Sequence, residues 1–169
     1  MRKLYLILLL PIFWLTSCND FLDVSADNEL LQKEIFADYK GVRMAVNGVY
    51  RNLSSTSLYG QNLTWGFASA IGHNYQSTSR IYLPYGLYEV ASFDWENASA
   101  QSLTGSIWAT GYNVIANCND IIQQVISKDT SFFGEGKMEK DMILGEAYAC
   151  RALMHFDMLR LFAPAPVHD

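Results

Sequence analysis

The sequence has few of the residues that catalytic and metal sites require. Its three histidines, His73, His155 and His168, have no second metal ligand at helical spacing, and no HExxH, GxSxG or paired CxxC pattern occurs. Basic residues are also scarce, with 12 Lys and Arg against 17 Asp and Glu, so a phosphate-binding face is not expected. We therefore expect no enzymatic activity, no metal or other cofactor, and no nucleic-acid partner.

One pair of carboxylates suggests an enzymatic interpretation. Asp94 and Glu96 flank Trp95, and glycoside hydrolysis needs two carboxyl groups about 5–10 Å apart across one bond. Neighbours in an extended segment point to opposite faces, so we expect a solvated acidic pair around a packed tryptophan. A surface glycoside hydrolase remains the less favoured alternative.

Residues 1–17 have the pattern of an export signal. A basic start, MRK, precedes an apolar run over residues 4–15, which is too short and wrongly flanked for a membrane-spanning helix of about 20 residues. Leu15-Thr16-Ser17-Cys18 resembles the lipobox in which lipoprotein processing acylates the cysteine, although an ordinary signal with a chance cysteine is the alternative. We expect a covalent lipid on Cys18, and a tether over residues 18–37.

Apolar residues recur with the helical period in the remaining chain, so residues 38–169 are expected to form one mainly α-helical domain. Asp38 is placed to cap the first helix, Gly41 and Gly48 within it would admit a neighbouring helix closely, and Pro164 ends the last one. The expected helices cover residues 38–53, 58–70, 101–127 and 138–162.

The last two helices each carry two apolar rows, so we expect both to be covered over wide arcs, with Trp95 and Trp108 in the core and His155 a hydrogen-bonded core residue. Residues 128–137 contain two glycines and are long enough to reverse the chain, which makes these helices an antiparallel pair. Cys118 and Cys150 lie one on each helix. Buried free thiols are favoured, and a disulfide is the alternative.

Residues 72–97 have no helical period and form an irregular, aromatic-rich loop region in which a short ribbon is possible. Sugar rings present apolar faces edged with hydroxyls, so aromatic platforms beside planar polar groups suit a glycan. The alternative, that the tyrosines cover the helical core with their hydroxyls outward, stays open. The candidate ligand-binding residues are Tyr75, Tyr82, Tyr85, Asn74 and Arg80.

Several short motifs resemble one family. Gly145-Glu146-Ala147, Arg151-Ala152 and FDMLRLFAPAP at residues 156–166 look like the "GEA…RA…F.L.R.FG..P" helix of the SusD-like (RagB/SusD) nutrient-binding lipoproteins. Residues 108–122 match the family's "W...Y..I...N.II", and residues 18–23 match its usual mature start, "C.DFLD".

The resemblance implies the N-terminal part of the SusD-like fold, with tetratricopeptide-like helix pairs. It also implies a lipid-anchored protein on the outer face of the outer membrane. Such a protein captures an oligosaccharide or polysaccharide, or in some members a peptide, and delivers it to a SusC-like TonB-dependent transporter. A helical adaptor that docks to a transporter or fimbrial subunit without binding a ligand is the alternative. Family members run on for several hundred residues more, so we expect an incomplete domain whose last two helices expose apolar sides.

Overall fold

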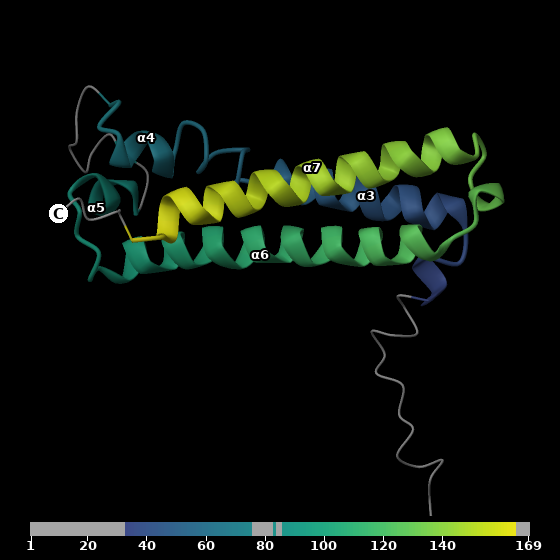
Figure 1. Cartoon of the computed structure of the whole chain (residues 1–169). Coiled ribbons are helices and arrows are strands. Elements are labelled where there is room, and N and C mark those ends of the chain that lie inside the picture. Colours follow the sequence, from purple (N-terminus) through teal and green to yellow (C-terminus); the bar gives the residue numbers. More distant parts are fainter. Residues whose placement is uncertain (1–32, 76–82, 84–85, 165–169) are drawn as a thin grey trace, which may run out of the picture. The chain divides into compact units, whose positions relative to one another are not determined.

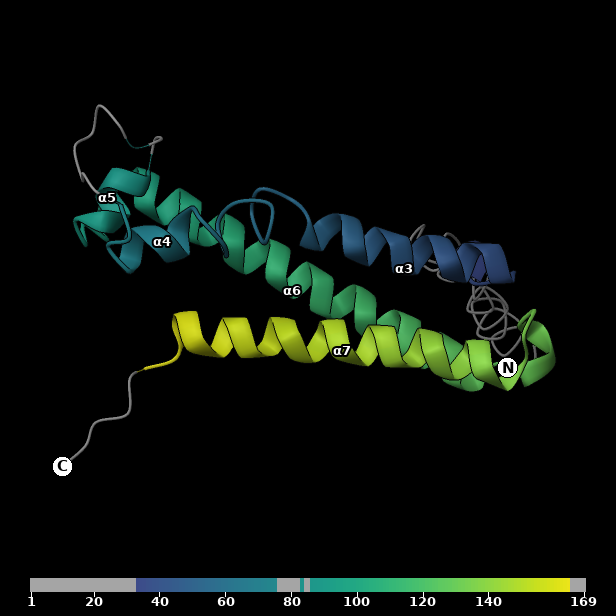
Figure 2. The ribbon, with the colours of Figure 1, turned by 90° about the horizontal axis from the view of Figure 1, so that it is seen from above.

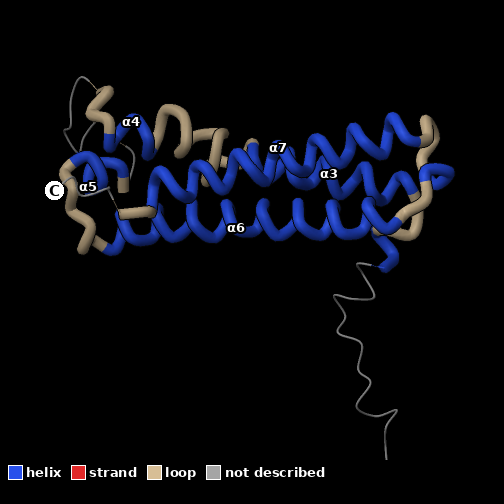
Figure 3. The backbone as a smooth tube through the Cα atoms, in the orientation of Figure 1, coloured by secondary structure: helices blue, strands red, loops and turns tan. Residues whose placement is uncertain are grey.

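A computed structural model describes residues 33–75, 83 and 86–164 of the chain. These residues form helices and connecting loops, and the described ranges contain no strand (Figure 3). The predicted mainly α-helical fold is confirmed. The elements are α3 (Tyr39–Leu53), α4 (Phe67–Ile71), α5 (Leu87–Ala91), α6 (Ala98–Ser127), the 3₁₀ turn η2 (Thr130–Phe132) and α7 (Lys137–Phe162).

The three long helices belong to one compact unit that begins at Ile35. α6 and α7 lie side by side and antiparallel, as predicted, and α3 packs on the same side of α6 as α7 (Figures 1 and 2). The short helices α4 and α5 contact each other beside the N-terminal end of α6 (Figure 1). One end of the bundle is therefore made of short helices and loops.

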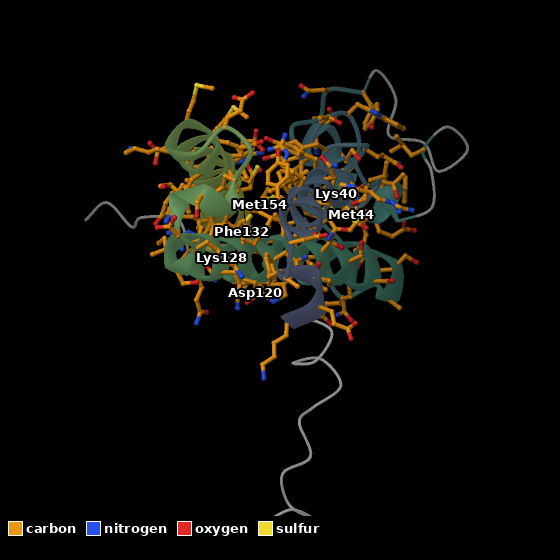
Figure 4. All side chains as sticks on the ribbon, turned by 90° about the vertical axis from the view of Figure 1, so that its right-hand side faces the viewer. Lys40, Met44, Asp120, Lys128, Phe132 and Met154 are labelled. Atoms are coloured by element: carbon orange, nitrogen blue, oxygen red, sulfur yellow. The ribbon has the colours of Figure 1, made fainter. Side chains whose placement is uncertain are left out.

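The core lies where α3, α6 and α7 meet. Met154 of α7 is fully buried among the helices (Figure 4). Each long helix contributes one apolar stripe, as its three–four spacing predicts. The stripes consist of Val42, Val46 and Val49 of α3, Ile107, Val114, Cys118, Ile121 and Val125 of α6, and Ile143, Ala147, Cys150, Met154 and Met158 of α7.

Both described cysteines are buried free thiols, which confirms the favoured interpretation. Burial, with a smaller contribution from the nearby Cys150, raises the pKa of Cys118 to about 11. Burial also raises the pKa of Cys150. Because thiolates rather than thiols react, these two side chains act as small apolar core residues at neutral pH.

The α6–α7 turn is fastened by one lysine. Lys140 Nζ donates to the carbonyl oxygens of Ile126, at 3.0 Å, and Lys128, at 2.6 Å, where α6 ends. A cation there satisfies carbonyls that lack helical partners and complements the helix dipole. The Lys128 ammonium in turn lies 4.7 Å from the centre of the Phe132 ring in η2 (Figure 4). The predicted chain reversal is confirmed.

The prediction of a helix over residues 58–70 is wrong. Residues 54–66 form successive turns, and only α4 is helical. The backbone doubles back so tightly that a Cβ on Gly60 would lie 2.3 Å from the carbonyl oxygen of Ser54. The apolar residues of this segment have helical spacing, which suggested a helix. The turns form instead because Gly60, which has no side chain, lets two parts of the backbone come close together.

The prediction that α6 and α7 are covered over wide arcs holds only in part. Trp95 and Trp108 are 43% and 46% exposed rather than in the core, and His155 is exposed as well. The second row of α6 is divided, because Ile115 and Ile122 are buried whereas Trp108, Tyr112 and Ile126 are exposed. On α7, Tyr148 of the second row is exposed as well. The expectation that α6 and α7 expose apolar side chains is confirmed.

The two glycines of α3 have different surroundings. A Cβ on Gly41 would lie 1.7 Å from the carbonyl oxygen of Ile35, whereas a Cβ on Gly48 would meet nothing within 4 Å. Gly41 thus permits the close approach that we expected, but to the preceding segment rather than to a neighbouring helix. It is held there by Asp38, which caps α3 as predicted by accepting a bond from Gly41 N at 2.7 Å.

We predict opposite effects for the matched substitutions Gly41→Ala and Gly48→Ala. Gly41→Ala should lower the free energy of unfolding by about 1–3 kcal/mol, because the methyl group forces the backbone apart. Gly48→Ala should raise it by up to about 1 kcal/mol through helix propensity. Urea unfolding followed by circular dichroism measures both, and equal effects of the two changes would contradict this account.

A buried carboxylate joins α7 to α3. The Tyr39 hydroxyl donates to Glu139 Oε1, and Glu139 Oε2 accepts from the Glu135 backbone N–H at 3.1 Å. The hydrogen bond from Tyr39 lowers the pKa of Glu139, with smaller help from the Glu135 amide. These bonds favour the ionised form of Glu139. They therefore stabilise the fold fully at pH values above the ordinary glutamate pKa of 4.5. This stabilisation is lost as the pH falls through the pKa of Glu139 in the folded protein.

We predict that Glu139→Gln makes the urea midpoint less dependent on pH. The midpoint of the variant should lie furthest below the parent at pH 6–7, and this gap should narrow below about pH 4.5 as Glu139 becomes protonated. Unfolding curves between pH 3 and 7 measure it. A gap that stays constant over this range would show that the charge of Glu139 does not matter.

Candidate ligand-binding site

Two of the five predicted ligand-binding residues are described. The Tyr75 hydroxyl donates to the Trp65 carbonyl oxygen, and its half-buried ring packs against the core, as in the alternative interpretation. Asn74 is exposed just after α4. Tyr82, Tyr85 and Arg80 lie outside the described residues. The role of this loop in binding stays a prediction.

An open pocket of about 400 Å³ lies between the N-terminal half of α6 and the C-terminal end of α7. It combines three aromatic rings with two uncharged polar side chains and a glycine. Its described lining consists of Trp95, Gln101, Thr104, Gly105, Trp108 and Phe162. No described lining residue carries a charge.

Aromatic contacts fix one wall of this pocket. Trp108 of α6 and Phe162 of α7 meet edge to face, with ring centres 5.0 Å apart and planes at 89°. Tyr112, one turn further along α6, lies 4.6 Å from Trp108 between ring centres. Such pairs add about 0.5–1.5 kcal/mol beyond burial. The wall therefore depends on α6 and α7 keeping their relative position.

The other wall comes from the turn between α5 and α6. Trp95 lies 6.1 Å from Phe93 and 6.4 Å from Phe67 between ring centres. Phe93 has a left-handed backbone, with φ of 55°, and the next amide, of Asp94, bonds the Glu89 carbonyl oxygen at 2.9 Å. A non-glycine residue in this conformation costs about 1–3 kcal/mol, so the surrounding contacts must hold it. The aromatic cluster supplies those contacts.

The polar side chains of the pocket are held by the first turns of α6. Gln101 Nε2 donates to the Trp95 carbonyl oxygen at 3.3 Å, and Thr104 Oγ1 donates to the Ala100 carbonyl oxygen at 2.7 Å. The amide oxygen of Gln101 has no partner among the described residues. Gly105 leaves room, because a Cβ there would meet nothing within 4 Å.

This arrangement suits an uncharged ligand with apolar faces and hydroxyl edges. The tryptophan rings can stack on such faces, while the amide and hydroxyl groups bond to the edges. Asp94 and Glu96 beside Trp95 are both exposed, as expected for a solvated pair. The described part of the chain contains no group of three potential metal ligands.

Sequence reasoning missed this pocket because it placed both tryptophans in the core. Two signals were present. Trp95 is flanked by two carboxylates, and Trp108 shares its helical face with the small or polar residues Gln101, Thr104 and Gly105. An apolar ring among polar neighbours on one face indicates a surface site.

The motif residues that suggested a family have structural roles. Arg151 Nη1 of α7 donates to Asn119 Oδ1 of α6 at 2.9 Å. Glu146 lies 3.7 Å from the Arg43 guanidinium of α3, measured between Oε2 and Nη1. These motif residues therefore mark contacts between helices, whereas Trp108 and Phe162, which also belong to the motifs, line the pocket.

The structure is that of a helical protein with an open pocket lined by aromatic rings, and comparison with known proteins shows its family. Residues 20–169 match the SusD-like family described as "Starch-binding associating with outer membrane". The chain therefore belongs to the SusD-like family. No solved structure matches it at comparable significance.

Two curated relatives come from Formosa agariphila. SusD-like protein P2 is 23% identical over 174 residues, which cover 100% of this chain and 32% of the relative. SusD-like protein P25 is 26% identical over 160 residues, which cover 93% of this chain and 29% of the relative. The chain thus spans about a third of the length of these relatives. Among the described helices, none has the length and apolar character to cross a bilayer.

Proposed function

We propose that the protein binds a glycan in the pocket between Trp95, Trp108 and Phe162. The observation that carries this proposal is the combination of exposed indole rings with Gln101 and Thr104 around one open space. Aromatic faces stack on the C–H faces of sugar rings, and the amide and hydroxyl groups bond sugar hydroxyls. The family description, which names starch binding, supports a glycan over other ligands.

We further propose that a lipid on Cys18 holds the protein at the outer membrane, where it hands the glycan to a SusC-like TonB-dependent transporter. The family's association with the outer membrane supports this location. The basic start, the apolar run and Leu15-Thr16-Ser17-Cys18 support the anchor. Two or three acyl chains hold a protein on a bilayer stably, which one chain does not.

Binding without hydrolysis fits the pocket better than glycosidase activity. Cleavage of a glycosidic bond needs two converging carboxyl groups. The described lining has none, and Asp94 and Glu96 are solvent-exposed neighbours in sequence. Release of reducing sugar from a retained polysaccharide would instead favour a glycoside hydrolase.

We predict that Trp95→Ala and Trp108→Ala each weaken glycan binding about tenfold or more. Each removes an aromatic face whose burial by a sugar is worth about 1.5–3 kcal/mol. Native gel electrophoresis in gels containing soluble starch or other polysaccharides measures retention. Trp65→Ala is the matched control, because Trp65 is 56% exposed but does not line the pocket. If both pocket variants are still retained, the glycan binds at a different site. If no polysaccharide retains the parent protein, the alternative of a helical adaptor that binds no ligand is favoured.

We predict that Cys18→Ser abolishes lipid attachment. The parent protein, expressed in a bacterial host with radioactive palmitate, should carry label and partition with the outer membrane, whereas the variant should be unlabelled and soluble. Cys118→Ala should keep the label, because Cys118 is a buried core thiol. An unlabelled, soluble parent protein would refute the anchor.

A further inference from the structure

α4 ends in a Schellman motif that has a histidine where glycine is usual. The His73 amide donates to the Ala70 carbonyl oxygen at 3.2 Å. The next amide, of Asn74, donates to the Ser69 carbonyl oxygen at 3.0 Å. In this motif the residue that follows the helix cap has a left-handed backbone, and His73 holds that position with φ of 50°. A side chain is strained there, so glycine is the residue expected.

α5, which contacts α4, ends in the same way with a phenylalanine. The Phe93 amide donates to the Val90 carbonyl oxygen at 3.1 Å, and Phe93 has φ of 55°. The Asp94 amide completes the motif by donating to the Glu89 carbonyl oxygen at 2.9 Å. Two neighbouring helices thus both end on an aromatic ring in a position that favours glycine. The rings must supply contacts that offset this strain.

The two rings supply a contact with each other. The centres of the His73 and Phe93 rings lie 5.3 Å apart, with their planes at 36°. His73 Nε2 also lies 2.9 Å from the Ala91 carbonyl oxygen, which can only accept, so Nε2 donates this bond. Both side chains are exposed, so burial in the core does not explain these two rings. What they provide is a connection between the ends of α4 and α5.

This connection reaches the pocket through Trp95. The Phe93 and Trp95 ring centres lie 6.1 Å apart, and the Trp95 amide donates to the Phe93 carbonyl oxygen at 3.1 Å. Trp95 forms one wall of the pocket and is 43% exposed, so the core alone does not fix its ring. Its described ring contacts are with Phe93 and the buried Phe67. The orientation of the indole therefore depends on where the Phe93 ring lies.

We propose that His73 is a positioning residue of the pocket, which holds the Phe93 ring and thereby sets the orientation of the Trp95 ring. His73 is not among the described residues that line the pocket, so it acts only through these two rings. A ring that is already ordered loses less side-chain freedom when a ligand stacks on it. The resulting gain in glycan affinity rests on the proposed function, whereas the orientation of Trp95 does not.

Glycine substitutions remove the rings without disturbing the backbone. His73→Gly and Phe93→Gly each keep the left-handed conformation, which glycine adopts without strain. Both variants should therefore keep the Tm of the parent within about 3 °C or raise it. Phe93→Tyr is the conservative control, because it retains a ring. Ser92→Gly is the matched control, because it adds the same backbone freedom at an exposed neighbour and removes no ring.

Fluorine NMR of protein labelled with 5-fluorotryptophan measures the order of Trp95 without any ligand. Trp95→Phe assigns its resonance, and Trp108 is the internal control from the same pocket. The Trp95 resonance should shift and broaden in His73→Gly and in Phe93→Gly, because the ring samples more orientations. The Trp108 resonance should stay unchanged, as should the Trp95 resonance in both control variants.

Retention in gels that contain soluble starch measures the effect on binding. His73→Gly and Phe93→Gly should each weaken binding about three- to tenfold, which corresponds to the cost of ordering one side chain. The double variant should lose no more than Phe93→Gly alone, because both residues act through one ring. In a Trp95→Ala background, His73→Gly should have no further effect.

An unchanged Trp95 resonance in both glycine variants would overturn the proposal, and so would an equal change in Ser92→Gly. A loss of binding by His73→Gly that keeps its full size in the Trp95→Ala background would also overturn it, because His73 would then act by another route. A parent protein that no polysaccharide retains would overturn the proposed function but not the role of His73, which the Trp95 resonance decides.

Discussion

The close packing of α6 against α7 is the constraint on which the rest of the fold depends. At Gly111 of α6, an added Cβ would lie 2.7 Å from Met158 Cε of α7, so the helices meet where one has no side chain. Met154 and Met158 fill the irregular space beside it, which suits their flexible thioethers. α3 then closes the remaining side. The position of every pocket residue on α6 and α7 follows from this contact.

Polar bonds across the helices set register more than stability. Arg151 to Asn119 joins α7 to α6, and Tyr39 to Glu139 joins α7 to α3. The Tyr59 hydroxyl also donates to Asp157, which is buried on α7 and accepts a second bond from Arg160 Nε at 2.6 Å. A buried carboxylate without such partners would cost several kcal/mol. The bonds to the buried carboxylates of Glu139 and Asp157 therefore penalise a slipped arrangement of the helices.

Periodicity predicted the long helices and little of what joins them. The limits of α3 and α7 follow from apolar spacing, from Asp38 as a cap and from Pro164 as a stop. α6 begins at Ala98 rather than at the predicted residue 101, because Asn97 caps it there. The turns after α3 were missed because their bonds run between backbone groups, which leave no side-chain pattern. The local signs of them were Gly60, Gly66 and the Ser-Ser-Thr-Ser run at residues 54–57.

The candidate site was harder to predict for a related reason. Its walls come from Trp95 and Trp108, thirteen residues apart, and from Phe162, which lies far along the chain. Only tertiary packing brings them together. Helical spacing says which residues share a face, but not whether a neighbour covers that face. Trp108 and His155 were therefore assigned to the core, whereas both side chains are exposed in the structure.

Phe162 is the final residue of α7, and helix ends fray. One side of the pocket is thus formed by the last turn of a long helix. Occupancy of the pocket and order in that turn are then thermodynamically linked, so each raises the population of the other. Unwinding of that turn would remove one aromatic ring from the pocket and leave the two tryptophans, Trp95 and Trp108.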